Sequence, residues 1–220
     1  TNLGGDGQFY WGAIASIYIA IIGHGLPLPL LAILSWLGGC IAGGLWGALA
    51  GFLKAYLNAN EVITTIMLNY IATLFISFLV HGPLKEPGGY IPQTQPVPSA
   101  LHLPQIVSGT RAHAGLLVAI IALVIYYVFI WKTVYGYRLK ATGFSSKGAR
   151  YAGINTQGYN ILTLFLSGAF AGLAGVVEVY GIHYRVLEGI SPGYGFTAVV
   201  VALLGRFHPI GILLAALLLA

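Results

Sequence analysis

The chain has 220 residues, of which 58% are hydrophobic and only 7% are charged. Soluble domains carry about 25% charged residues, so this chain lacks the polar surface that a water-soluble protein of its size needs. The composition therefore predicts an integral membrane protein. At about 20 apolar residues per crossing, the length allows about five to seven spans plus loops. The net charge of +5 is small and scattered, which argues against a nucleic-acid partner.

Apolar runs predict helices, in chain order, at residues 9–22, 30–53, 62–80, 115–131 and 161–180, followed by an interrupted run at 196–220. The first run is short and follows a glycine-rich stretch, and the last is broken at 205–209 by Gly, Arg and Pro. The pattern thus predicts an all-α, polytopic helical bundle and allows discontinuous helices at 1–22 and 196–220. Whether the last run crosses the membrane or folds back stays open. We expect a chain truncated at both ends, because it lacks an initiator Met and stops inside an apolar run.

Basic residues predict the orientation, because cytoplasmic loops carry an excess of Lys and Arg. If the loops after the second and fourth runs are cytoplasmic, segment 133–158 lies inside and segment 81–113 lies outside. The inner side then holds six basic residues and the outer side three: Lys54, Lys132, Arg138, Lys140, Lys147 and Arg150 inside, and Lys85, Arg111 and Arg185 outside. The outer segment is rich in proline, which predicts an ordered surface loop. A docking or gating role and a passive connection are both open for it.

Small residues recur along two of the predicted helices. A helix face without side chains lets another helix approach closely, so these positions predict helix packing in a bundle. A role in sliding or rocking during transport is the alternative. The positions are Gly39, Gly43, Gly47 and Gly51 on one helix and Gly168, Gly172 and Gly175 on the other.

Polar residues on the helix predicted at 62–80 form a candidate solute path. Glu61, Thr65 and Asn69 are four residues apart and share one helix face. A buried amide in hydrocarbon needs a partner helix or an aqueous path. With the nearby ring of Tyr70, these four residues are predicted to line the path of a planar polar solute. Hydrogen bonding between helices is the alternative for Asn69, and a position at the lipid headgroups is the alternative for Glu61.

Residues able to carry catalysis are not apparent in the sequence. There is no phosphate-binding loop with its lysine, no Ser-His-Asp candidate and no paired-carboxylate motif. The six His residues form no H-x-x-H pattern and Cys40 is alone, so neither a metal site nor an intrachain disulfide is expected. Glu178, near the end of the run 161–180, is either a functional carboxylate at membrane depth or a solvated or Arg185-paired helix end.

Four stretches of the chain carry a family resemblance. Residues 60–72 read Asn-Glu-Val-Ile-Thr-Thr-Ile-Met-Leu-Asn-Tyr-Ile-Ala, and the others are residues 2–8, 149–155 and 191–211. Together they resemble permease subunits of bacterial ABC importers for nucleosides, within the simple-sugar and branched-chain amino-acid permease family. The chain departs from the family at Asp6, where Glu is commoner, in the proline-rich outer segment, and in lacking the first and last family helices.

The resemblance implies a single transmembrane permease domain at 1–220, in a multi-pass protein of the bacterial cytoplasmic membrane. It implies three partners besides the bilayer: a second permease subunit, ABC ATPase subunits that hold ATP and Mg, and an extracytoplasmic solute-binding protein. It implies no cofactor in this chain itself. The expected solute is a nucleoside, and a ribose- or galactose-type sugar is the alternative.

The resemblance also implies that segment 133–158 couples the permease to the ATPase, through Ala149, Arg150, Tyr151 and Gly153. Plain positive-inside anchoring is the alternative for its basic residues. Two other classes of protein stay open. A secondary transporter or channel working without ATP would need an embedded ion-coupling carboxylate, and a structural membrane scaffold would not require Asn69 or the broken segment 205–209.

Overall fold

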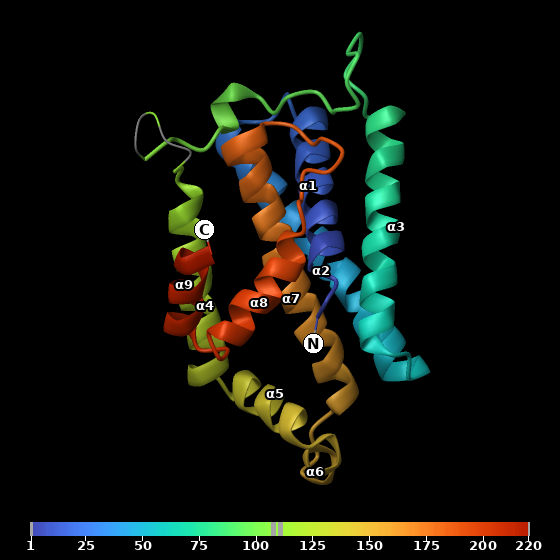
Figure 1. Ribbon diagram of the computed structural model, residues 1–220, viewed down its shortest axis with the longest axis vertical. Coiled ribbons are helices and arrows are strands. Elements are labelled where there is room, and N and C mark those ends of the chain that lie inside the picture. Colours follow the sequence, from blue (N-terminus) through green and yellow to red (C-terminus); the bar gives the residue numbers. More distant parts are fainter. Residues whose placement is uncertain (1, 107–108, 110–111, 220) are drawn as a thin grey trace.

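Helices make up most of the chain in a computed structural model, which describes residues 2–106, 109 and 112–219 (Figure 1). The helices are α1 (Gly5–Ile22), α2 (Leu28–Leu57), α3 (Glu61–His81), α4 (Gly115–Lys132), α5 (Val134–Phe144), α6 (Ser146–Tyr151), α7 (Thr156–Glu178), α8 (Tyr194–Leu204) and α9 (Pro209–Leu219). A short 3-10 helix, η1 (Ser99–Leu101), lies in the outer segment, and a π-helical turn, η2 (Val179–His183), continues α7. Among the described residues, α2, α3, α4 and the continuous helix 156–183 are long and apolar enough to cross a membrane. The predicted helical membrane bundle is confirmed.

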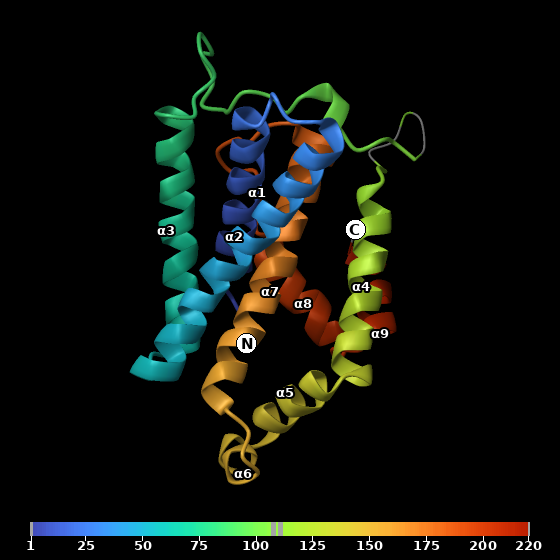
Figure 2. The same ribbon diagram turned by 180° about the vertical axis from the view of Figure 1, so that it is seen from behind.

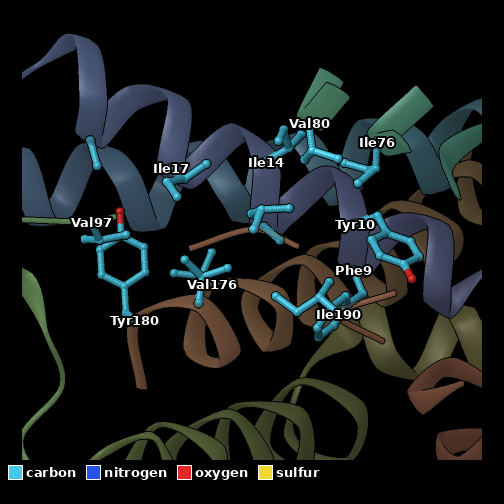
Figure 3. Close-up of a cluster of buried hydrophobic side chains, with 14 of the residues drawn as sticks. Phe9, Tyr10, Ile14, Ile17, Ile76, Val80, Val97, Val176, Tyr180 and Ile190 are labelled. Carbon is cyan, nitrogen blue, oxygen red and sulfur yellow. The ribbon is translucent and has the colours of Figure 1, made fainter. Parts of the chain in front are cut away.

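Helix α1 forms the centre of the bundle, with α2, α3 and α7 packed around it (Figures 1 and 2). Ala13, Ile17 and Ala20 of α1 have no exposed surface. Figure 3 shows side chains of α1 meeting Val80 of α3 and Val176 of α7 in one apolar cluster. Lipid tails are as apolar as these side chains, so close packing, rather than exclusion of water, holds the helices together.

Most of the glycine positions lie where α2 and α7 touch, and Gly175 lies where α7 touches α1. A Cβ atom added at Gly43 would lie 2.5 Å from the carbonyl oxygen of Gly168, and one at Gly172 would lie 2.5 Å from that of Gly39. Gly47, Gly51 and Gly175 likewise meet backbone of a neighbouring helix, at Leu164, Ile161 and Phe9 respectively. The two backbones therefore approach each other more closely than any side chain would allow.

The two irregular runs take different forms. Helix α1 has no internal break and begins at Gly5, four residues before the predicted run, after irregular backbone at residues 2–4. The last run folds back on itself, because α8 and α9 are joined by a tight turn at 205–208 and pack against each other. Gly205 and Gly211 make this contact backbone to backbone, and Arg206 and Phe207 in the turn have positive φ angles of 49° and 57°.

The outer segment runs across one end of the bundle and is fastened there by backbone hydrogen bonds. The N–H of Thr94 donates to Val186 O at 3.0 Å, and the N–H of Leu103 donates to Tyr180 O at 2.9 Å. Residues 85–91 project beyond this layer, and Tyr90 at their tip is fully exposed. Arg111, counted with the outer basic residues, lies outside the described residues.

The opposite end of the bundle carries the predicted cytoplasmic segment, folded into the two short helices α5 and α6 (Figures 1 and 2). Each helix start in this region has a side-chain cap that satisfies a free backbone N–H. Thr133 caps α5, Ser145 caps α6 and Asn155 caps α7. Three capped starts in succession explain why the segment turns twice instead of forming the single surface helix that its length allows.

Candidate solute path and coupling segment

A layer of buried polar side chains surrounds the first turn of α1, and Asn69 of α3 is part of it. Asn69 Oδ1 accepts a hydrogen bond from the N–H of Gly7 at 2.8 Å, and Asn69 Nδ2 donates to Leu3 O at 2.8 Å. The first N–H groups of a helix have no partner within the helix, so Asn69 satisfies one of them and fixes the chain that leads into α1. Asn69 lies eight residues into α3, about 12 Å along its axis, within a helix long and apolar enough to cross a membrane.

Asn2 and Gln8 connect the same turn of α1 to α7. Asn2 Nδ2 donates to Gln8 Oε1 at 2.7 Å and to Ser167 Oγ at 2.8 Å, while Gln8 Nε2 donates back to Asn2 Oδ1 at 3.2 Å. Gln8 is 1% exposed. A buried amide is tolerated in an apolar bundle when its donors and acceptors are paired, and these reciprocal bonds provide that pairing.

Asp6 joins the starts of α1 and α8. Asp6 Oδ1 accepts from the hydroxyl of Ser191 at 2.6 Å and from the N–H of Gly195 at 3.0 Å. The side chain lies in the first turn of α1 and beside the first turn of α8, where a negative charge is favoured by the helix dipoles. A Cβ atom at Gly5 would lie 2.9 Å from the Cα of Gly195, so glycine at both positions lets the two helix starts touch.

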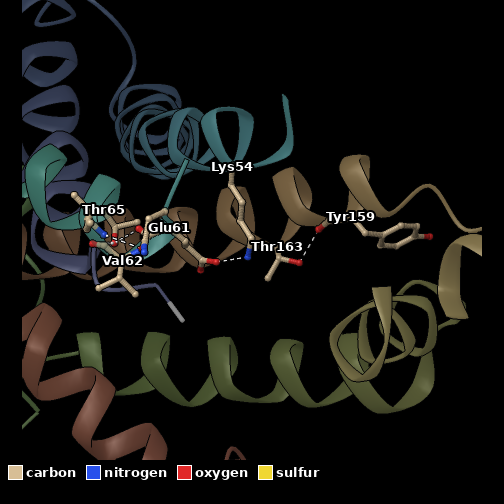
Figure 4. A network of polar contacts seen from close by, with 8 residues as sticks. Lys54, Glu61, Val62, Thr65, Tyr159 and Thr163 are labelled. Atoms are coloured by element: carbon tan, nitrogen blue, oxygen red, sulfur yellow. Dashed lines mark hydrogen bonds and ion pairs between the residues drawn. The ribbon is translucent and has the colours of Figure 1, made fainter. Parts of the chain in front are cut away.

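The four residues predicted to line a path lie in three different surroundings. Thr65 and Asn69 are both buried and face the start of α1. Glu61 is the first residue of α3 and forms an ion pair with Lys54 of α2 (Figure 4). Tyr70 lies on another face and is 65% exposed. The structure therefore brings two of the four residues together, and the lining role of all four stays a prediction.

A mostly apolar cavity of about 430 Å³ lies between α1, α2 and α3, close to the polar layer. The ring of Trp11 stacks on Phe75 at 5.0 Å between centroids and lies 4.9 Å from the ring of Trp46. The indole nitrogens of both tryptophans are buried and have no hydrogen-bond partner. The cavity is lined by Trp11, Ile14, Ala15, Tyr18, Ala42, Phe75, Leu79, Pro83 and Leu84.

The predicted coupling residues lie in and directly after α6. Ala149 is 5% exposed and packs inside the α5–α6 turn, whereas Tyr151 is 94% exposed. Gly153 has a φ of 77°, a left-handed conformation that favours glycine. A cavity of about 280 Å³ adjoins these residues and is lined by Arg150, Gly153, Ile154, Asn155, Thr156 and Gln157.

Glu178 lies at the outer end of α7, beside the π-helical turn. Its Oε1 is 3.3 Å from Nδ1 of His183, and Arg185 bonds to Glu86 at 3.3 Å. Of the alternatives for Glu178, the pairing with Arg185 is therefore not formed in this structure. Within the part of the chain that the structure describes, no three His, Cys, Asp or Glu side chains come together as a metal site.

The sequence reasoning gave no role to Asn2, Asp6, Gln8 and Ser191, although all four lie in stretches that carry the family resemblance. One signal was present: Asp6 and Gln8 are polar residues directly before an apolar run, spaced to fall on the first turn of its helix. Their partners are far away in the chain, and no local pattern connects them.

Comparison with known proteins gives matches over nearly the whole of this chain. The family described as "Branched-chain amino acid transport system / permease component" matches residues 1–220. The glucose ABC transporter permease protein of Haloferax volcanii is 36% identical over all of this chain and 60% of its own length. The guanosine ABC transporter permease protein of Bacillus subtilis is 37% identical over 99% of this chain and 63% of its own length. The nucleoside ABC transporter permease protein of Lactococcus lactis is 37% identical over 99% of this chain and 62% of its own length.

The chain thus spans somewhat less than two thirds of the length of the curated relatives it matches. No solved structure matches it.

Proposed function

Because the chain belongs to the branched-chain amino acid transport system / permease component family, we propose that it is the membrane-spanning part of an ABC importer that takes up nucleosides. It is a multi-pass membrane protein, and we place it in the cytoplasmic membrane. The observation that carries the proposal is the match of nearly the whole chain, at 37% identity, to permease proteins named for guanosine and for nucleosides.

The polar layer supports a neutral solute with several hydroxyl and amide groups. Asn2, Gln8 and Asn69 supply amides and Ser191 supplies a hydroxyl, all within the bundle. Such groups exchange hydrogen bonds with a hydroxylated sugar and a flat base without trapping them. A sugar is the second candidate, since a permease named for glucose is 36% identical over the whole chain.

The catalytic work of the importer belongs to separate ATPase subunits, which hold ATP and Mg, and this chain carries no cofactor. Segment 133–158 is the docking element for an ATPase. Its support is the pair of almost fully exposed aromatic side chains on its surface, Phe144 at 90% and Tyr151 at 94% exposed. Aromatic side chains of this kind serve as anchors when they enter a pocket of a partner protein.

Two further partners complete the proposal. The extracytoplasmic segment 81–113 receives a solute-binding protein, and the projecting tip around Tyr90 supports this role. A second permease subunit pairs with this one within the membrane. Apolar side chains along α3, such as Leu74 at 71% and Phe78 at 63% exposed, leave a surface that lipid or another helix can cover.

An ATP-independent transporter is the rival function, and it needs a carboxylate free to bind a coupling ion. Oδ1 of Asp6 is bonded to Ser191 and Gly195, and Glu178 is paired with His183. These contacts favour the ABC importer, in which ATP rather than an ion gradient supplies the energy.

The experiment is uptake by the full-length permease reconstituted in vesicles with its ATPase, its partner permease and its binding protein. Labelled guanosine, adenosine, uridine, ribose, galactose and glucose are compared with and without ATP. We expect ATP-dependent uptake of nucleosides that the sugars do not compete away. Accumulation driven by an ion gradient alone would contradict the importer, and competition by a sugar alone would move the assignment to the sugar class.

A further inference from the structure

The α8–α9 hairpin contacts the rest of the bundle in two places, at the start of α8 and beside α4. Helix α8 contacts α1 near its own start, and α9 contacts α4. Figure 1 shows α8 crossing obliquely from the central bundle toward the foot of α4, with α9 returning beside α4. A helical unit fixed mainly at its ends follows any displacement of either attachment.

The lower attachment in Figure 1 is a set of contacts between the C-terminal end of α4 and the turn of the hairpin. The ring of Trp131 meets the ring of His208 edge-to-face, with 5.8 Å between centroids, an arrangement that is favourable for aromatic pairs. One turn earlier in α4, the hydroxyl of Tyr126 donates to Phe207 O at 3.1 Å. Phe207 and the preceding Arg206 both adopt left-handed backbone conformations. Such conformations are unfavourable for side-chain-bearing residues and persist only where the surroundings hold them.

The same tryptophan touches the coupling segment. Lys140 of α5 places its ammonium group 4.5 Å from the centre of the Trp131 ring, a cation–π contact. Trp131 therefore contacts α5 and the hairpin turn at once. Since α5 also follows α4 with only Thr133 between them, a tilt of α5 acts on this ring directly.

The upper attachment ends at the polar layer. Asp6 Oδ1 binds the hydroxyl of Ser191 and the N–H of Gly195, and the backbones at Gly5 and Gly195 are in contact. The glycine contact leaves no side chains to interlock there, so α8 can pivot about the Asp6 bonds. Movement of the hairpin turn then changes the angle at which α8 meets the start of α1.

We propose that Trp131, held between Lys140 and His208, is a positioning residue that transmits movement of α5 through the α8–α9 hairpin to the polar layer at the start of α1. The inference rests on the proposed function, because it gives the ATPase docked at segment 133–158 a route to the solute path. It assigns the hairpin turn to the coupling machinery and goes beyond the four coupling residues around α6.

The test measures solute molecules transported per ATP hydrolysed in the complete reconstituted importer. Trp131→Leu keeps an apolar side chain but removes the ring that contacts His208 and Lys140 and that also meets Tyr126 and Tyr127. Trp131→Phe keeps a ring. We expect Trp131→Leu to lower the transport ratio about 5- to 10-fold, as for loss of a typical allosteric coupling, while the ATPase still hydrolyses ATP. Trp131→Phe should restore most of the ratio.

Lys140→Met supplies a second variant outside the bundle, and Lys132→Met is its matched control, because Lys132 is an exposed lysine at the end of α4. Lys140→Met should lower the ratio and Lys132→Met should not. An unchanged ratio in both Trp131→Leu and Lys140→Met would overturn the proposal, as would an equal fall of uptake and hydrolysis. Absence of ATP-driven uptake in the unaltered importer would instead contradict the proposed function.

Discussion

Asn69 has two possible roles, anchoring the start of α1 and lining the solute path, and experiment can separate them. Both polar ends of its amide are bonded to backbone at the start of α1, which makes it an anchor in the resting structure. The predicted role in lining the solute path requires in addition that these bonds be exchanged for bonds to the solute during transport.

Replacing Asn69 with Leu should lower the thermal stability of the purified protein and the nucleoside uptake of the reconstituted importer. The change leaves the N–H of Gly7 and the carbonyl of Leu3 buried without their partner, which costs about 1–3 kcal/mol for each group. Thermal unfolding in detergent and uptake in vesicles measure the two effects. Tyr70→Phe, at the exposed neighbouring position, is the control.

Different outcomes would contradict the two roles of Asn69. Unchanged heat resistance in Asn69→Leu would contradict the anchoring role. Reduced heat resistance with normal nucleoside uptake would remove Asn69 from the solute path and leave the family assignment intact.

At the scale of elements, the contact between α2 and α7 depends on the absence of side chains. Gly43→Ala should destabilise the bundle by about 1–3 kcal/mol, the usual cost of overpacking, because its Cβ would lie 2.5 Å from Gly168 O and 2.7 Å from the Cα of Gly172. Gly43→Leu should be worse. Gly143→Ala in α5 is the control, since a Cβ there meets nothing within 4 Å.

Thermal unfolding and the yield of dispersed protein measure this difference. Equal heat resistance of Gly43→Ala and Gly143→Ala would mean that the α2–α7 contact can widen without cost, as the sliding alternative requires. A drop confined to Gly43→Ala would favour a fixed packing surface.

The long elements could be predicted because a helix in lipid must be apolar for about 20 residues. The runs 30–53, 62–80 and 115–131 correspond to α2, α3 and α4 with small shifts at their ends. The start of α1 was predicted too late, at residue 9, because Asp6 and Gln8 are polar. They can be buried in the bundle only because hydrogen bonds connect this turn to residues far away in the chain. The fold-back of the run 196–220 could not be predicted. A broken apolar run has the same sequence pattern whether the chain crosses the membrane or turns back within it.

The candidate site could be predicted only in part for the same reason. The spacing of Thr65 and Asn69 gave their common face on α3, which is a local property. The partners of that face, at Leu3 and Gly7, follow from how α1 packs, and so does the exposure of Tyr70.

At the scale of the whole molecule, coupling to an ATPase is tested most cleanly on the surface of α6. Tyr151→Ala should reduce co-purification of the ATPase and uptake, yet leave heat resistance unchanged, because a side chain that is 94% exposed supports little packing within the chain. Tyr56→Ala, in the last turn of α2 and 56% exposed, is the matched control. Normal ATPase retention in Tyr151→Ala would move the docking site elsewhere.

Bulky charged residues at Ala149 or Gly153 should also weaken ATPase docking while leaving membrane insertion intact. Their effect combines docking with local folding, because Ala149 is buried and Gly153 requires a positive φ. For this reason the comparison of Tyr151 with Tyr56 carries more weight.

The central place of α1 has a consequence for biogenesis. A carboxylate or an amide in a membrane segment is costly until it is paired, and Asp6 and Gln8 both lie in the first turn of α1. Two partners of this turn are made much later: Asn69 follows Gly7 by 62 residues, and Ser191 follows Asp6 by 185 residues. Helix α1 therefore reaches its final surroundings only after α8 has been made, and its polar turn must be sheltered in the nascent chain until then.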